Sequence, residues 1–186
     1  MKRALILVLV TVVLLTLITT SLSKSIPDGF IGLKWGHSLD KMREEMLLDR
    51  VNIDDKNPDV AMAFINLNRL NPFPDLKRTG IGLNFYKDKL YGGVIMLTNY
   101  KDWNLLSNAI KEKYGDFSTE EMKNVYGKRI GIKLKWDFGI GIGIITSEFN
   151  QVKDEGTISY FFPPKELMDK LSSQEKMDRS KVKGKL

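Results

Sequence analysis

The sequence predicts an α+β domain, in which an antiparallel sheet has helices on one face and a hydrophobic signal or anchor helix precedes it. Two observations predict the domain. Several segments alternate apolar and polar residues with a period of two, as half-buried strands do, and two others place their apolar residues on one helical face. The third observation is an apolar run near the N-terminus, which predicts the segment in front of the domain.

The first 23 residues have the three parts of an export signal. Lys2 and Arg3 precede an apolar run that starts at Ala4, and a small, polar stretch around Ser23 follows it. The alternative is an uncleaved membrane anchor, because the segment from Ala4 to Leu22 is just long enough to span a bilayer and would allow membrane association. Either interpretation places the rest of the chain outside the cytoplasm, as a periplasmic or secreted protein or as an anchored one that faces outward.

Residues 24–171 are predicted to form a single domain whose first half holds one helix and about three strands. A short strand over residues 30–35 ends at Gly36, and Ser38 is a suitable N-cap for a helix that runs to about Leu48. Residues 52–59 are expected to be a polar loop and residues 60–67 a strand. Residues 81–86 and 90–97 alternate in polarity and are expected to pair as a hairpin.

The second half is predicted to repeat this order. Asn99 can cap a helix with Asp102 in a capping-box position, and Gly115 is placed to end it. Strands are expected over residues 130–136, 140–144 and 157–162, followed by a short helix from Pro164 to about Leu171.

The two halves share a short pattern of glycine, isoleucine, any residue, leucine, any residue and a large aromatic residue. It covers residues 80–85 and 131–136. The pattern indicates two tandem helix-plus-three-strand units derived by duplication. The alternative is a chance similarity between two amphipathic strands.

The charge distribution argues against a nucleic-acid partner. The formal net charge is +6, but the ends of the chain provide most of it, through Lys2, Arg3 and a basic tail over residues 172–186 that we expect to be disordered. A nucleic-acid-binding domain needs a basic face on its folded part, which is nearly neutral here. The chain has no cysteine, so an exported domain must be stable without disulfides.

The candidate binding residues are Trp35, His37, Gly141 and Gly143. Trp35 adjoins the break at Gly36 and has no clear place in the core. The run from Gly139 to Gly143 reads as a strand with isoleucines on one face and bare backbone on the other, against which an aromatic ring, a neighbouring element or a partner could lie. A surface or helix-capping role is the simpler interpretation of His37, because no nucleophile stands beside it.

No catalytic residues, metal ligands or cofactor are predicted. One histidine and no cysteine leave little for triads or zinc sites. The acidic run from Asp54 to Asp59 spaces its oxygens like a calcium loop, but it lacks the glycine and the glutamate that such a loop needs. A polar turn is the simpler interpretation, and a carboxylate-dependent hydrolase that uses Asp54, Asp55 or Asp59 is the enzymatic alternative.

Residues 30–38, with Phe30, Gly32, Trp35, Gly36 and Ser38 followed by an amphipathic helix, resemble the opening of small uncharacterised secreted or periplasmic bacterial proteins. The resemblance extends over roughly residues 28–162. It implies a bacterial envelope or secreted protein and carries no active site. Tandem helix-plus-sheet units resemble, more distantly, exported inhibitor and envelope-assembly modules that bind proteins across their sheets.

The sequence therefore favours a non-enzymatic binding or assembly module of the bacterial cell envelope, with another envelope or secreted protein as its partner. A small-ligand carrier, with a pocket between the sheet and the helices, is the second hypothesis, and the carboxylate-dependent hydrolase is the third.

Overall fold

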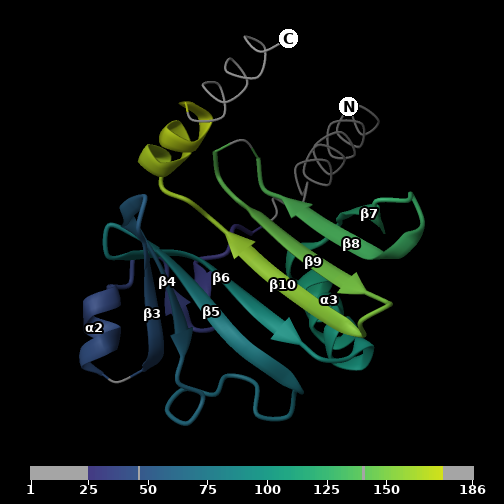
Figure 1. Cartoon of the computed structure of the whole chain (residues 1–186), viewed down its shortest axis with the longest axis horizontal. Helices are drawn as coiled ribbons and strands as arrows, with labels where there is room; N and C mark the ends of the chain where they lie inside the picture. Colours follow the sequence, from purple (N-terminus) through teal and green to yellow (C-terminus); the bar gives the residue numbers. More distant parts are fainter. Residues whose placement is uncertain (1–24, 46, 140, 174–186) are drawn as a thin grey trace, which may run out of the picture.

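The computed structural model describes residues 25–45, 47–139 and 141–173, and one eight-stranded antiparallel sheet dominates it (Figure 1). The strand order is β3-β4-β5-β6-β10-β9-β8-β7. The sheet therefore consists of two four-stranded meanders that meet where β6 pairs with β10. The strands are β3 (Leu48–Asp54), β4 (Asn57–Ile65), β5 (Arg78–Tyr86), β6 (Lys89–Leu97), β7 (Ser118–Lys123), β8 (Arg129–Asp137), β9 (Ile144–Asn150) and β10 (Glu155–Phe161).

The predicted α+β class is wrong, because the protein is mostly β. Strands make up 46% of the structure and helices 21%. The sequence predicted two units of one helix and three strands, but each unit consists of one helix followed by four strands. The predicted signal or anchor helix, from Ala4 to Leu22, lies outside the described residues. Among the helices that the structure does describe, none combines the length and the apolar character needed to cross a membrane.

The additional strands are the two edge strands, β3 and β7. In β3 only Leu48 and Val51 are partly buried, and in β7 only Met122 is. β7 has no alternation of apolar and polar residues to reveal it, whereas Val51 and Ile53 of β3 do alternate with polar residues. Residues 52–59 were predicted to be a polar loop, but they form the end of β3, its turn and the start of β4.

The repeated sequence pattern does not mark equivalent strands. Residues 80–85 lie in β5, the third strand of the first meander, and residues 131–136 lie in β8, the second strand of the other. In both places the large residues face the core, with Phe85 and Trp136 fully buried. The similarity therefore reflects two amphipathic strands with the same burial pattern, and the alignment that it suggests is offset by one strand.

Two helices and a small hairpin cover one face of the sheet. The hairpin pairs β1 (Gly29–Phe30) with β2 (Leu33–Lys34), and the helices are α2 (Leu39–Glu44) and α3 (Tyr100–Tyr114). Residues 165–173 are helical as well. The buried side chains of the hairpin, both helices and the inward face of the sheet form one hydrophobic core.

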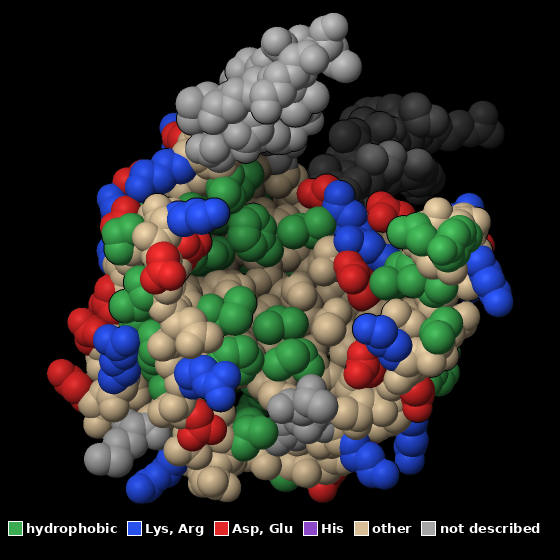
Figure 2. Space-filling model, viewed as in Figure 1, with side chains coloured by type: hydrophobic (Ala, Val, Ile, Leu, Met, Phe, Trp, Pro, Cys, Tyr) green, Lys and Arg blue, Asp and Glu red, His purple; other side chains and the backbone are tan. Residues whose placement is uncertain are grey.

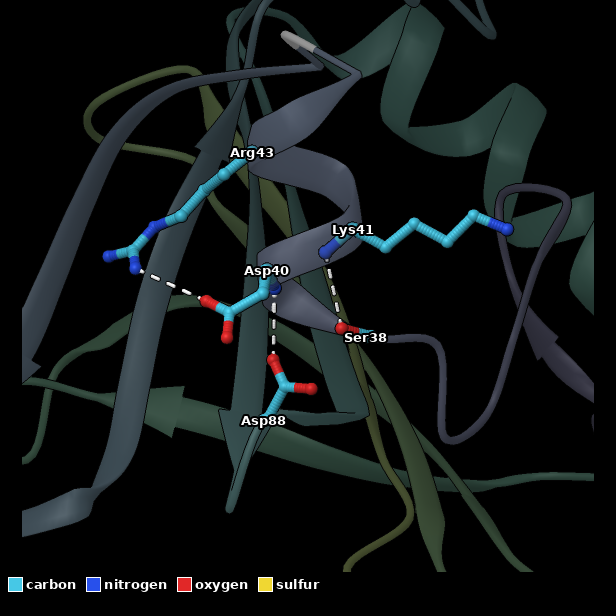
Figure 3. A network of polar contacts seen from close by, with 5 residues as sticks. All are labelled: Ser38, Asp40, Lys41, Arg43 and Asp88. Carbon is cyan, nitrogen blue, oxygen red and sulfur yellow. Dashed lines mark hydrogen bonds and ion pairs between the residues drawn. The ribbon is translucent and has the colours of Figure 1, made fainter.

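Helix α2 begins as predicted at Ser38, whose hydroxyl accepts a hydrogen bond from the Lys41 amide at 3.2 Å. A second cap comes from the turn between β5 and β6, where the Asp88 carboxylate accepts a bond from the Asp40 amide at 2.9 Å (Figure 3). The backbone oxygen of Asp88 accepts a bond from Leu39 as well. A short helix is marginal by itself, so α2 depends on this turn. It also ends earlier than predicted, at Glu44.

Helix α3 has the predicted capping box and C-terminal glycine. The Asn99 side chain accepts a hydrogen bond from the Asp102 amide at 2.9 Å and donates one to the Asp102 carboxylate at 2.8 Å. Gly115 ends the helix with φ of 77°, a conformation that glycine adopts without strain. The Gly115 carbonyl accepts a bond from the Trp136 indole at 3.0 Å, which ties the helix end to β8.

Aromatic rings lie directly on glycines of the two central strands. A Cβ added at Gly93 in β6 would be 2.3 Å from the ring of Phe30, and one at Gly156 in β10 would be 2.6 Å from Trp103. These two glycines let the hairpin and α3 approach the sheet backbone. Trp103 and Trp136 both belong to the core, since they are 3% and 0% exposed.

Candidate binding face

The opposite face of the sheet is the candidate functional site. Side chains of a strand alternate between the two faces, so the register assigns every paired residue to one of them. Ile81, Leu83 and Phe85 of β5 point into the core, and the intervening Gly82 and Asn84 therefore belong to the other face. Residues paired with these two across the sheet share that face. We call it the open face.

Apolar side chains on the open face come from the first meander. Phe64 of β4 and Val94 of β6 both pair with Gly82, and Met96 pairs with Gly80. These side chains are half-buried, and Met62 is 41% exposed. Figure 2 shows hydrophobic side chains gathered near the middle of this view of the molecule, with charged side chains around them.

Gly80 and Gly82 of β5 have no side chains, so the surface in the middle of the open face lies close to the sheet backbone. A Cβ at Gly82 would be 3.0 Å from the Val94 side chain, and one at Gly80 would be 3.0 Å from the terminal methyl of Met96. The neighbouring side chains therefore lie partly over bare backbone. This arrangement produces a low apolar surface made of Met62, Phe64, Val94 and Met96, which we call the apolar centre.

The second meander presents small hydroxyl groups and then charges on the same face. Ser159 of β10 pairs with Val94, and Thr146 of β9 pairs with Ser159. Beyond them, Lys133 of β8 forms an ion pair with Glu148 of β9 at 2.8 Å. These charges neutralise each other, so the open face changes from apolar to polar without becoming basic.

Residues 165–173 lie over one end of the open face, and we call this segment the cover. Leu167 packs against Tyr86 and Tyr91 in a small hydrophobic cluster of its own. Glu166 forms an ion pair with Lys87, whose hydrogen bond lowers the pKa of the Glu166 carboxyl. Lys170 forms an ion pair with Asp59 at 3.1 Å. These contacts leave the apolar centre outside the cover.

Trp35 and Gly143, both predicted to bind a partner, each lie against the ring of Phe162. The Trp35 ring stacks on Phe162 with centroids 5.2 Å apart, and a Cβ at Gly143 would be 2.2 Å from the Phe162 ring. The Trp35 indole donates a hydrogen bond to the Pro27 carbonyl at 2.7 Å. An aromatic ring of the protein itself therefore lies against Gly143.

The segment around Gly143 is a turn rather than the predicted strand. Gly139 and Gly141 have φ of 113° and 77°, and β9 begins only at Ile144. Gly141 is exposed. The wide positive φ values explain the error, because alternating glycines allow a turn as readily as they mimic a strand.

His37 lies between the β1–β2 hairpin and α2. Its backbone bonds to Lys34 and Leu90, while its Nε2 is buried without a hydrogen-bond partner among the described residues. Trp35 and His37 thus lie near the cover, on a different part of the molecule from the apolar centre. The sequence analysis did not identify the apolar centre as a site. It did place the four residues of the apolar centre in predicted strands.

The carboxylates of the hydrolase hypothesis do not converge. Asp54 accepts hydrogen bonds from the Lys56 and Asn57 amides at 2.8 and 3.3 Å, which closes the β3–β4 turn. Asp59 pairs with Lys170, and Asp55 is exposed. Within the described part of the chain, no three acidic or histidine side chains are grouped so that they could hold a metal ion.

Comparison of the chain with family models, with curated proteins and with solved structures gave no match. The candidate site therefore rests on its geometry and on the sequence.

Proposed function

We propose that this protein is a non-enzymatic binding module that docks onto another envelope or secreted protein through the open face of its sheet. The observation that carries the proposal is the apolar centre, whose half-exposed side chains project from a rigid antiparallel sheet. Contiguous apolar surface with a polar border is typical of protein-binding sites. The export-like sequence of residues 1–23 supports a location outside the cytoplasm.

The balanced charges of the open face indicate what kind of partner fits. Lys133 is paired with Glu148, and Lys135 is paired with Asp137 at 3.3 Å. A partner held mainly by counter-charges would need a face of one sign. We therefore expect a partner that inserts apolar side chains over the apolar centre, and binding that changes little with salt concentration.

Site-specific photocrosslinking in the native cells tests the proposal. A photoreactive amino acid replaces Met96 on the open face, or Leu105, a 58% exposed residue of α3 that serves as the matched control. We expect a covalent adduct with one other protein from position 96 and none from position 105. Adding Met62→Glu should reduce the adduct by more than about fivefold, because a charge in an apolar interface costs over about 1 kcal/mol.

Leu105→Glu is the control substitution, since it adds the same charge on the other side of the sheet and should leave the adduct unchanged. Equal crosslinking from positions 96 and 105 would contradict the proposal. An adduct of twice the mass of this chain would show instead that the open face joins two copies of it.

A further inference from the structure

A second candidate site lies on the other side of the sheet, beneath α3. It is a cavity of about 410 Å³ between α3, the β1–β2 hairpin and the central strands β6 and β10. This volume falls in the range of about 300–1,000 Å³ that small-molecule sites occupy. Ile95 of β6 and Ile158 of β10, which face the core, form its floor.

The walls of the cavity are apolar. Helix α3 contributes Leu106 and Ile110, and the hairpin contributes Phe30 and Ile31. Such a surface favours a hydrocarbon group over water, because apolar area that is buried there is removed from solvent. The ligand must therefore bring an apolar part.

The turn of the β1–β2 hairpin places an unusual residue, Ile31, in the wall of the cavity. Ile31 and Gly32 have φ of 49° and 86°, as the central residues of a type I′ turn do. Asn-Gly is the favoured pair for this turn, and a β-branched residue in the left-handed region is strained. The chain thus has an apolar side chain at a position where local conformation favours a polar one.

The polar groups at the cavity favour an anionic head group. Lys34 and Lys113 are exposed residues at its border, and neither forms an ion pair in the described part of the chain. The border also holds one carboxylate, Asp28, so the net charge of these three side chains is +1. Tyr160 also lines the cavity, and its phenol hydroxyl can donate a hydrogen bond.

From this geometry we propose that the cavity binds a single-chain amphiphile with an anionic head, of the fatty-acid class. The hydrocarbon chain lies between α3 and the floor of Ile95 and Ile158, and the carboxylate lies at the border beside Lys113. This site is separate from the open face, because its floor consists of side chains on the opposite surface of the same strands. Its failure would leave the proposed docking function intact.

Photolabelling of the full chain tests this site. The probe is a fatty acid with a diazirine on its chain, and mass spectrometry maps the labelled peptides. We expect labels within residues 28–34 and 106–114, and we expect excess decanoate to remove them while decylamine does not. A phosphatidylcholine with the same diazirine distinguishes a free fatty acid from a membrane lipid, and it should not label these peptides.

Two substitutions on α3 test the binding of the ligand's hydrocarbon chain and of its head group separately. Ala109 is an exposed residue at the cavity, so Ala109→Trp should fill the entrance without disturbing the core and abolish labelling. Lys113→Glu should weaken competition by decanoate about fivefold or more, as expected for replacing an attraction at the surface by a repulsion. Lys111→Glu, two residues away and outside the cavity lining, is the matched control and should have no effect.

Several results would overturn the proposal. Labelling that persists in Ala109→Trp would place the probe elsewhere, and equal competition by decylamine would exclude an anionic head group. Labelling by the phospholipid in place of the fatty acid would show that the site takes a two-chain lipid instead.

Discussion

The two meanders have the same strand order, but their helices differ in length and in their own N-terminal caps. In the first, α2 has six residues and takes one of its caps from the distant turn at Asp88. In the second, α3 has fifteen residues and takes its capping box from its own Asn99 and Asp102. Both helices also take a bond from a distant turn, since the Asp154 carboxylate between β9 and β10 accepts one from the Tyr100 amide at 3.2 Å. The helices therefore differ in length and in the caps that their own side chains supply.

The aromatic side chains that lie on Gly93 and Gly156 also differ between the two meanders. At Gly93 the three nearest atoms are Cδ1, Cε1 and Cζ of the Phe30 ring, all of which move with the side-chain torsions. At Gly156 they include the Cβ of Trp103 at 2.9 Å, which side-chain rotation cannot move. The second meander thus has the tighter attachment between helix and sheet, and substitutions should reveal the difference.

The largest effect is expected from Gly156→Ala. The new methyl group would lie 2.9 Å from the Cβ of Trp103, which no side-chain rotation can move, so we expect the free energy of unfolding to fall by about 2–3 kcal/mol. Gly93→Ala should cost less, about 1 kcal/mol, because the Phe30 ring can move. Urea denaturation, with the slope of each transition compared to that of the parent protein, measures both. A greater loss for Gly93→Ala would reverse the ranking of the two attachments.

Removal of the N-caps should have the next largest effect. Asn99→Ala leaves α3 without its own cap and should cost about 1 kcal/mol. Ser38→Ala should cost only about 0.5 kcal/mol, since Ser38 makes one bond with the Lys41 amide, whereas Asn99 makes two bonds with Asp102. The double variant Ser38→Ala/Asp88→Ala should lose less than the sum of the single losses, because each single substitution already breaks the hydrogen bond between the two side chains. Simple additivity in thermal denaturation would show that the two caps act independently.

Asp88 should make α2 sensitive to acid. Burial favours the protonated form, but hydrogen bonds from Ser38 and the Asp40 and Leu39 amides outweigh it and lower the pKa of Asp88 below its usual 3.8. Its contribution is therefore present above pH 3.8 and is lost as the pH falls through the lower folded value. We expect Asp88→Asn to cost about 0.5 kcal/mol at pH 7, since solvent screens this exposed carboxylate. The cost should shrink toward zero below that pH window, and a cost that is constant with pH would contradict the assignment.

The smallest effect is expected on the open face of the second meander. Lys133→Ala removes the ion pair with Glu148 and should cost about 0.3 kcal/mol, because both groups are partly solvated. About 1 M salt should remove this difference. Met62→Ala, on the first meander, provides the contrast, since loss of an apolar contact should not depend on screening. Denaturation at low and high salt distinguishes the two.

Local signals in the sequence predicted the elements that local interactions determine. Ser38, Asn99 and Gly115 cap their helices as expected, and the hairpin of β5 and β6 forms where polarity alternates. The fold class was wrong because the two edge strands, which are mostly exposed, were not predicted. Their formation depends on pairing with a neighbour, which no window of the sequence reveals.

The candidate site shows the same limit. The sequence placed Val94 and Met96 in a strand, but whether a helix or solvent lies over them depends on which face the helices cover. Trp35 drew attention because it had no place in an amphipathic pattern, and its partner Phe162 is far along the chain. Contacts between residues so distant in sequence follow from the strand order, which the sequence did not determine.

The pairing of β6 with β10 has a consequence for how the chain folds. Six of the seven pairings in the eight-stranded sheet join strands that follow each other in the chain, whereas β6 meets β10 only after α3 and the whole second meander have intervened. Loop closure over that distance costs entropy that local hairpins do not lose. The rate-limiting step in folding is therefore expected to be the joining of two preformed meanders, with α3 bridging the seam through its contacts with β6, β9 and β10.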